Sequence, residues 1–229
     1  MKKFTYYLST LFSRNAKYVF NKSIYIHSSE LKRNHIKLDN HSNKVSFLNA
    51  TAKKCNIRVE GKNNEVIIRA TLCSCSIYIV GENNKLIIDS ECSFNDSRFI
   101  INGSNNNITI LHETTANNLM AVCMGKSNHI HIGRGCMFAD NVELWSSDTH
   151  PIRDENGSLL NPSKPITIKD HVWIGKHTKI LKGVTIGENA IIGMNSLVCK
   201  NIQGHTLNVG SPTRCIKQGV YWERNFITE

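Results

Sequence analysis

An aliphatic residue stands at every sixth position over the segment 168–198, at Ile168, Ile174, Ile180, Ile186, Ile192 and Val198. A period of six fits neither an α-helix, with 3.6 residues per turn, nor an isolated strand, in which side chains alternate with a period of two. It is typical of a chain that coils in short flat faces, with one aliphatic side chain per face turned inward. The pattern therefore predicts an all-β protein, a parallel β-helix.

A longer repeat precedes the hexads, between about residues 41 and 132. Its asparagines recur at steps of 20 to 22 residues, at Asn43, Asn64, Asn84, Asn106 and Asn128, and glycines open the last four units, at Gly61, Gly81, Gly103 and Gly125. Glycine and asparagine tolerate left-handed backbone angles, which suits them to tight corners. We expect one coil per 20–22 residues, with a structural ladder of stacked asparagine amides at one corner.

The hexads are interrupted between Trp145 and Pro165, and this stretch holds three of the four prolines of the chain. It predicts a loop at about 146–165 that leaves the solenoid, and loops on rigid scaffolds often carry function. Residues 1–40 show no clear repeat and are expected to form a helical or irregular N-terminal cap. The β-helix domain is expected over 41–217, and a short tail that could form a helix over 218–229.

The net charge of +10 is unevenly distributed along the chain. Residues 1–54 hold 11 Lys and Arg against Glu30 and Asp39, a net of +9. This asymmetry suggests a polyanion or an acidic membrane surface as a contact of the N-terminal segment, and the alternative is a solvated basic face. No helix-turn-helix, zinc-finger or RNP-like motif accompanies the charge, so we do not expect a nucleic-acid partner.

The cysteines and the N-terminus bear on the cellular compartment. Cys55 and Cys75 each precede a glycine by six residues, so we expect them as reduced core residues at equivalent coil positions. The single C-x-C pair, Cys73 and Cys75, lacks the second pair of a zinc site. Polar residues interrupt the apolar stretch 4–12 and no signal cleavage site follows, so we expect a retained N-terminus and a cytoplasmic protein. No apolar run approaches the roughly 20 residues of a membrane span.

Four segments occur in a characteristic order: D-T-H-P-I at 148–152, P-I-T-I-K-D-H-V-W-I-G at 165–175, G-V-T-I-G-E-N-A-I-I-G-M-N-S-L-V-C-K-N-I at 183–202 and G-S-P-T-R-C-I-K at 210–217. Their order and spacing resemble the hexapeptide-repeat acetyltransferases, a family that includes galactoside and maltose O-acetyltransferases and enzymes that modify capsules or O-antigens. The resemblance is close over about 125–217 and concerns only the architecture before that.

The resemblance implies a left-handed β-helix that assembles as a homotrimer and binds acetyl-CoA in a groove between neighbouring subunits. By its place in D-T-H-P-I, His150 corresponds to the general base of the family. Trp173 corresponds to the residue that lines the groove near the pantetheine arm, with Gly175 after it. The residues that match those facing the CoA phosphates are Lys200, Arg214 and Lys217.

These residue types suit acyl transfer from a thioester to an alcohol. A histidine has an unperturbed pKa near 6.5, so its neutral imidazole can accept the hydroxyl proton at physiological pH. No cysteine or serine nucleophile is required, and we expect direct transfer in a ternary complex. Either Asp148 or a backbone carbonyl could bind the second imidazole nitrogen. The small-sugar members of the family place an acceptor-contacting asparagine one coil before the histidine, and Asn117 and Asn118 lie near that place.

The predicted function is acetyl-CoA-dependent O-acetylation of a sugar hydroxyl, in a capsular or O-antigen polysaccharide or its precursor, and the basic segment suits an anionic glycan. N-acetylation of an amino sugar is the first alternative. A metal-dependent hydratase of the γ-carbonic-anhydrase kind is less favoured, because neither His129 and His131 nor His171 and His177 have the five-residue spacing of its zinc ligands, and no metal is expected. A non-catalytic β-helix protein is the last alternative.

Overall fold

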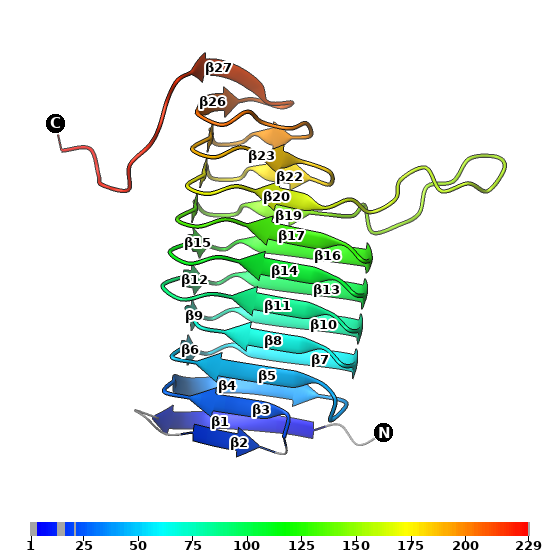
Figure 1. The fold of residues 1–229 in the computed structure, drawn as a ribbon, viewed down its shortest axis with the longest axis vertical. Helices are drawn as coiled ribbons and strands as arrows, with labels where there is room; N and C mark the ends of the chain where they lie inside the picture. Colours follow the sequence, from blue (N-terminus) through cyan, green and yellow to red (C-terminus); the bar gives the residue numbers. More distant parts are fainter. Residues whose placement is uncertain (1–3, 13–16, 21, 229) are drawn as a thin grey trace.

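The computed structural model describes residues 4–12, 17–20 and 22–228, and these residues form 27 strands and no helix. Lys2, Lys3 and Arg14 of the basic segment lie outside the described residues. The chain winds into a tall solenoid with the N-terminal coils at the bottom of Figure 1 and the C-terminal coils at the top. The part of the chain that the structure describes contains no helix that could span a membrane.

The solenoid has three faces. The first is a nine-stranded sheet of β2 (Lys17–Phe20), β3 (Ile24–His27), β5 (Lys44–Leu48), β8 (Glu65–Ile68), β11 (Lys85–Ile88), β14 (Asn107–Ile110), β17 (His129–Ile132), β20 (Ile166–Ile168) and β23 (Thr185–Ile186). All of its pairings after β2–β3 are parallel.

The other two faces belong to one 18-stranded sheet. The long-strand face consists of β4 (Glu30–Leu38), β7 (Asn56–Lys62), β10 (Ser76–Glu82), β13 (Arg98–Ser104), β16 (Met120–Lys126), β19 (Glu143–Trp145), β22 (Lys179–Leu181) and β25 (Leu197–Val198). The short-strand face consists of β6 (Thr51–Lys53), β9 (Thr71–Cys73), β12 (Ser93–Asn95), β15 (Thr115–Asn117), β18 (Met137–Phe138), β21 (Trp173–Ile174), β24 (Ile191–Ile192) and β26 (Thr206–Val209). Two strands close the ends: β1 (Phe4–Phe12) pairs antiparallel with β4, and β27 (Arg214–Gln218) pairs antiparallel with β26.

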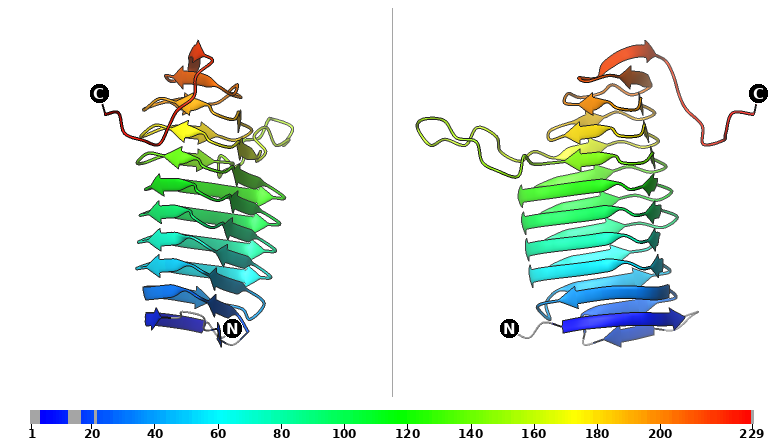
Figure 2. Two further views of the ribbon diagram at one scale, coloured as in Figure 1. Left: turned by 60° about the vertical axis from the view of Figure 1, so that its left-hand side comes forward. Right: turned by 180° about the vertical axis from the view of Figure 1, so that it is seen from behind.

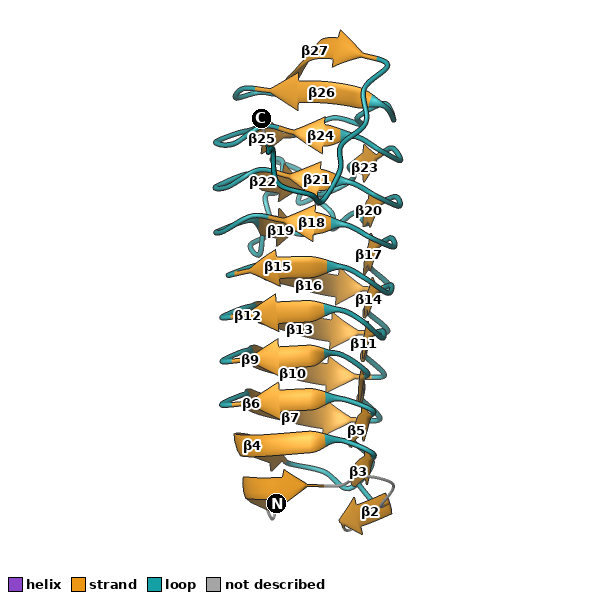
Figure 3. Ribbon diagram, turned by 90° about the vertical axis from the view of Figure 1, so that its left-hand side faces the viewer, coloured by secondary structure: helices purple, strands orange, loops and turns teal. Residues whose placement is uncertain are grey.

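The winding is left-handed. In Figure 1 the strands of the nine-stranded sheet run from right to left at the front, and the long strands return from left to right behind them as the coils rise. Figure 3, turned by 90°, shows the same sense, with β15 and β12 running right to left in front of the long strands. The predicted left-handed parallel β-helix is therefore confirmed.

The interior is a thin column of stacked aliphatic side chains. The six hexad residues from Ile168 to Val198 are all at most 1 % exposed. Cys55 and Cys75 are also buried, and all eight cysteines are free, as expected. Burial raises the pKa of the Cys136 thiol to about 12, so this thiol stays protonated in the core.

The predicted asparagine ladder is confirmed in hydrogen-bond detail. The backbone N–H groups of Asn64, Asn84, Asn106 and Asn128 each donate to the side-chain oxygen of the asparagine one coil earlier, at 2.9–3.0 Å. The amide nitrogens of Asn43, Asn64, Asn84 and Asn106 donate to the carbonyl of the glycine one coil later, at 2.8–3.0 Å. Through their backbone and side-chain groups together, Asn64, Asn84 and Asn106 thus each link three neighbouring coils, which satisfies their buried amides.

Both chain ends differ from the expected helical or irregular segments. The N-terminal segment forms strands, and parallel pairing begins where Ile24 pairs with Val45. Antiparallel addition of β1 occupies the backbone edge of β4, which would otherwise be open to aggregation. The tail is not helical either, because residues 219–228 extend along the solenoid and donate hydrogen bonds to coil carbonyls.

The loop at 146–165 and the tail after β27 project from opposite sides of the solenoid (Figures 1 and 2). The loop leaves between β19 and β20 and closes on itself through a bridge between Arg153 and Leu159. The tail turns back from β27 and descends to the level of β21 (Figure 3).

Candidate active site

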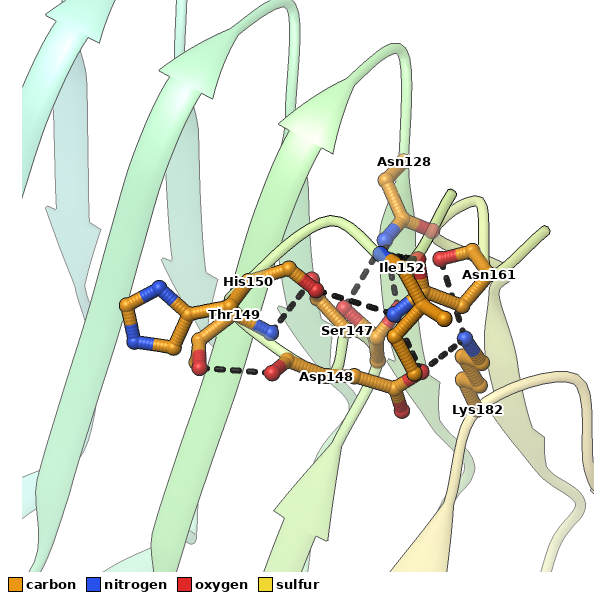
Figure 4. Close-up of polar contacts among 9 residues, drawn as sticks. Asn128, Ser147, Asp148, Thr149, His150, Ile152, Asn161 and Lys182 are labelled. Carbon is orange, nitrogen blue, oxygen red and sulfur yellow. Dashed lines mark hydrogen bonds and ion pairs between the residues drawn. The ribbon is translucent and has the colours of Figure 1, made fainter. Parts of the chain in front are cut away.

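His150 lies in the protruding loop, five residues after β19 ends. Its backbone N–H donates to the carbonyl of Asp148 at 2.8 Å, across a tight turn in which Thr149 has a φ of 67°. The side chain is exposed, and the imidazole points away from the polar residues at the base of the loop (Figure 4). The ring is therefore open to a ligand that approaches the loop from outside.

The base of the loop is fixed by a polar cluster of Asp148, Asn161 and Lys182. Lys182, from the coil above, forms an ion pair with the Asp148 carboxylate and donates to the Asn161 carbonyl at 3.1 Å. The Asn161 amide donates to the Asp148 carboxylate and to the His150 carbonyl, both at 2.9 Å. The ammonium of Lys182 lowers the pKa of Asp148, so this carboxylate is charged at neutral pH.

This cluster bears on the partner of the imidazole. The Asp148 carboxylate binds Lys182 and Asn161, and among the described residues it makes no hydrogen bond to the His150 ring. Asp148 therefore shapes and anchors the turn that presents His150. Figure 4 shows the carboxylate on the side of the backbone opposite to the imidazole.

A groove of about 340 Å³ opens between the loop and the long-strand face beside His150. Its walls come from the loop and from the two coils below it, and include Asn102, Met124, His150, Leu159 and Asn161. The groove thus combines amide groups with apolar surface next to an exposed imidazole.

Trp173 lies on a different face of the solenoid. It points outward from β21 with 37 % of its surface exposed, above a second groove of about 340 Å³ on the short-strand face. Polar side chains from the coils below line this groove, among them Ser93, Asn95, Thr115 and Asn117. Asn117 is therefore grouped with Trp173 and not with His150.

The two grooves share no lining residue, so one chain does not bring His150 and Trp173 together. His150 extends from the loop side, and Trp173 faces the side of the tail. Within a single chain, the predicted base and the predicted groove tryptophan therefore border two separate grooves.

Gly175 has a packing role that its motif position did not reveal. A Cβ added here would lie 2.6 Å from the backbone nitrogen of Met194 in the next coil. Glycine is required for this close approach of two coils directly after Trp173. The predicted contact of Gly175 with the cofactor stays a prediction.

The three predicted cations lie toward the C-terminal end of the solenoid. Lys200 is exposed beside a groove of about 250 Å³ that also includes Cys215 of β27. Arg214 and Lys217 are exposed on β27. In the pairing with β26, Arg214 lies opposite Val209 and Lys217 lies opposite Leu207. None of the three forms an ion pair with any other residue that the structure describes, so their charges are available to an anion.

Sequence reasoning did not find Lys182, Asn161, Trp222 or Arg224. Lys182 and Asp148 are 34 residues apart, and Trp222 reaches His171 across 51 residues. Such contacts depend on which coils become neighbours, which a single motif does not specify. The only sequence signal for Asn161 is its place inside the polar loop.

The left-handed parallel β-helix with hexad coils agrees with the match to a family model. Residues 165–200 match the family model described as "Bacterial transferase hexapeptide (six repeats)". The chain therefore contains a hexapeptide-repeat segment like that of bacterial hexapeptide transferases, and the proteins it resembles over this segment are named as acetyltransferases.

Several relatives are sugar O-acetyltransferases. The chain is 42% identical over 92 residues to the galactoside O-acetyltransferase of Escherichia coli (strain K12), which covers 39% of this chain and 44% of that protein. It is 32% identical over 97 residues to the polysialic acid O-acetyltransferase of Escherichia coli O1:K1 / APEC, covering 42% of this chain and 32% of that protein. The matched part thus spans less than half the length of both curated relatives.

A solved structure extends the similarity over most of the chain. The structure of the polysialic acid O-acetyltransferase OatWY superposes with a TM-score of 0.71 at 29% identity, and covers 78% of this chain and 86% of that one. The polysialic-acid-specific acetyltransferase NeuO superposes with a TM-score of 0.55 at 27% identity, covering 79% and 89%. The similarity therefore includes the longer N-terminal coils as well as the hexads.

Proposed function

We propose that this protein transfers acetyl from acetyl-CoA to a hydroxyl group of an anionic polysaccharide or its precursor. The observation that carries the proposal is the exposed His150 imidazole, held on an anchored loop, in a chain that resembles a polysialic acid O-acetyltransferase over most of its length. A neutral imidazole in this position can accept the hydroxyl proton of an acceptor.

The proposed reaction is a direct transfer. The acceptor oxygen attacks the thioester carbonyl while His150 takes its proton, and the C–S bond of the tetrahedral intermediate then breaks. The imidazolium returns the proton to the CoA thiolate, so the enzyme ends in its starting state. Trp173 lines the pantetheine arm in this scheme, and the CoA phosphates are bound by Lys200, Arg214 and Lys217.

The site forms between two subunits of a homotrimer in this proposal. The loop and the tail project from opposite sides of the solenoid. A rotation about an axis parallel to the solenoid keeps every residue at its axial level, so a closed ring places the loop of one subunit beside the Trp173 face of the next. The groove beside His150 of one subunit and the groove beside Trp173 of the next then form one site.

An apolar column on the outside of the long-strand face supports this assembly. Its members pair from coil to coil in register, and they are Tyr78, Ile100, Val122, Trp145 and Leu181. Val122 is buried between its neighbours, and the other four are partly exposed. Partly exposed apolar side chains aligned on four of these five coils form a patch that is typical of a subunit interface.

The charge near the N-terminal end supports an acidic acceptor. Lys32 and Lys53 are paired in register on neighbouring coils, and Arg33 and Lys54 occupy the adjoining corner. All four side chains are exposed, and none forms an ion pair with another described residue. Such a cluster attracts a polyanion, and the two structural relatives act on polysialic acid.

The test is an acceptor comparison with the purified chain and acetyl-CoA, in which released CoA thiol and incorporated acetyl are both measured. We expect thiol release with polysialic acid, less release with a neutral galactoside, and acetyl that mild alkali removes as an ester. Alkali-stable acetyl formed only on acceptors with a free amine would instead establish N-acetylation. No acceptor-dependent thiol release with any hydroxyl acceptor would contradict the proposal.

A further inference from the structure

The C-terminal tail is tied to the corner of the solenoid next to Trp173. After β27 the chain turns back, and the backbone N–H of Val220 donates to the His205 carbonyl at 3.1 Å. Two coils lower, the indole N–H of Trp222 donates to the His171 carbonyl at 2.8 Å. Figure 3 shows this descent in front of the short-strand face.

Arg224 fixes the lower end of the tail. Its guanidinium donates to the carbonyls of Glu113 and Cys136 at 2.7 and 3.0 Å, and to the Thr115 hydroxyl at 3.0 Å. It also lies 5.7 Å from the centre of the Trp222 ring, in the range of a cation–π contact. Three hydrogen bonds from one planar group hold the tail at a single place along the solenoid.

Between these anchors, Trp222 is inserted into an aromatic stack. Its ring lies parallel to the His171 imidazole at 4.4 Å, and the His171 ring is fixed in turn by a hydrogen bond of 2.8 Å to Asn189. Trp222 is only 5 % exposed, although it belongs to a tail whose other large apolar residues are mostly exposed. Among the apolar side chains of the tail, Trp222 is thus the one that packs against the solenoid most completely.

Trp222 also packs against Trp173. The two indole centres are 6.1 Å apart at an angle of 44°, which is within the range of attractive aromatic pairs. Trp222 covers one side of Trp173, while the exposed part of Trp173 borders the polar groove on the short-strand face. The contact limits the orientations available to the Trp173 indole.

We propose that Trp222 is a positioning residue of the donor site: the tail holds the Trp173 indole in the orientation that binds the pantetheine arm of acetyl-CoA. The inference rests on the proposed function. Trp222 acts through Trp173, so it lowers the KM for acetyl-CoA and leaves the proton transfer at His150 unchanged. The tail is then a functional part of the site, in addition to covering the last coils.

The experiment compares Trp222→Ala, Trp222→Phe and Tyr221→Ala in the full chain. Tyr221 is the neighbouring tail residue and is 71 % exposed, so it is the matched control. We expect Trp222→Ala to raise the KM for acetyl-CoA and the Kd for CoA by roughly 3- to 10-fold, with kcat little changed. Trp222→Phe should recover part of the affinity because it keeps an aromatic ring, and Tyr221→Ala should match the wild type.

Calorimetric measurement of CoA binding and of the melting temperature distinguishes a role of Trp222 in CoA binding from a role in stability alone. Trp222→Ala protein with wild-type KM and Kd would overturn the inference while the wild-type activity stands. A lower melting temperature with unchanged CoA affinity of the folded fraction would assign Trp222 to stability alone and would overturn it as well. Wild-type protein that neither binds CoA nor releases its thiol would overturn the proposed function, and this inference with it.

Discussion

Replacement of His150 by alanine is expected to lower the rate of acetyl transfer by about 10²- to 10⁴-fold, the usual contribution of a positioned general base. The imidazole is exposed, and only the backbone of His150 takes part in the hydrogen bonds that anchor the loop. The variant should therefore fold, bind CoA and melt as the wild type does. The measurement is thiol release at saturating acetyl-CoA and acceptor.

His129→Ala is the matched control for this experiment. His129 is also an exposed histidine, at the start of β17, and it does not line the groove beside His150. Its removal should leave the transfer rate within about twofold of the wild type, since surface changes away from a site have small effects. If His150→Ala transferred acetyl at the wild-type rate, the assignment of the general base would be wrong.

Gly81→Ala is expected to cause the largest loss of stability among single methyl additions in the coils. Gly81 has a φ of +119°, and a Cβ there would lie 1.8 Å from the carbonyl oxygen of Gly103 in the next coil. The three nearest atoms are all backbone atoms of Gly103, so no side-chain rotation relieves the clash. Overpacking and an unfavourable left-handed backbone together cost about 2–5 kcal/mol, which corresponds to a fall in melting temperature of roughly 5–20 °C.

Gly157→Ala separates the two causes. Gly157, in the protruding loop, also has a positive φ, of +80°, but an added Cβ would meet no atom within 4 Å. It should cost only the backbone part, about 1–2 kcal/mol. Thermal unfolding followed by circular dichroism gives both values, and equal losses at the two positions would show that the close contact between Gly81 and Gly103 is not important for stability.

Much of the fold can be predicted from the sequence where asparagine or glycine residues recur at the corners of the coils. The hexads and the asparagine ladder recur because each coil must repeat the same inward face and the same tight corner. The first coil cannot be predicted from the repeat, because other residues occupy its corners. Lys22 and Ser23 directly precede β3 there, with a φ of 60° at Lys22, whereas Asn63 and Asn64 precede β8 in a later coil. Without recurring asparagine or glycine residues, the buried Ile24 and Ile26 do not reveal a repeat.

The site is less readable than the fold. The loop and its histidine are visible because they interrupt a regular pattern. The anchoring of that loop by Lys182, and the packing of Trp222 beside Trp173, depend on coils that come together only in the folded chain. The separation of His150 and Trp173 onto two faces likewise follows from the number of residues per coil in the solenoid and from no local motif.

The most direct test of a site shared between subunits is complementation between two inactive variants. We would co-express His150→Ala and Trp173→Ala chains and isolate mixed oligomers. In a closed ring with random mixing, about a quarter of the sites combine an intact His150 loop with an intact Trp173 face, so transfer should recover to about a quarter of the wild-type rate. If each site lay within one chain, the mixed oligomers would show no more activity than the mean of the two variants, and the account would be contradicted.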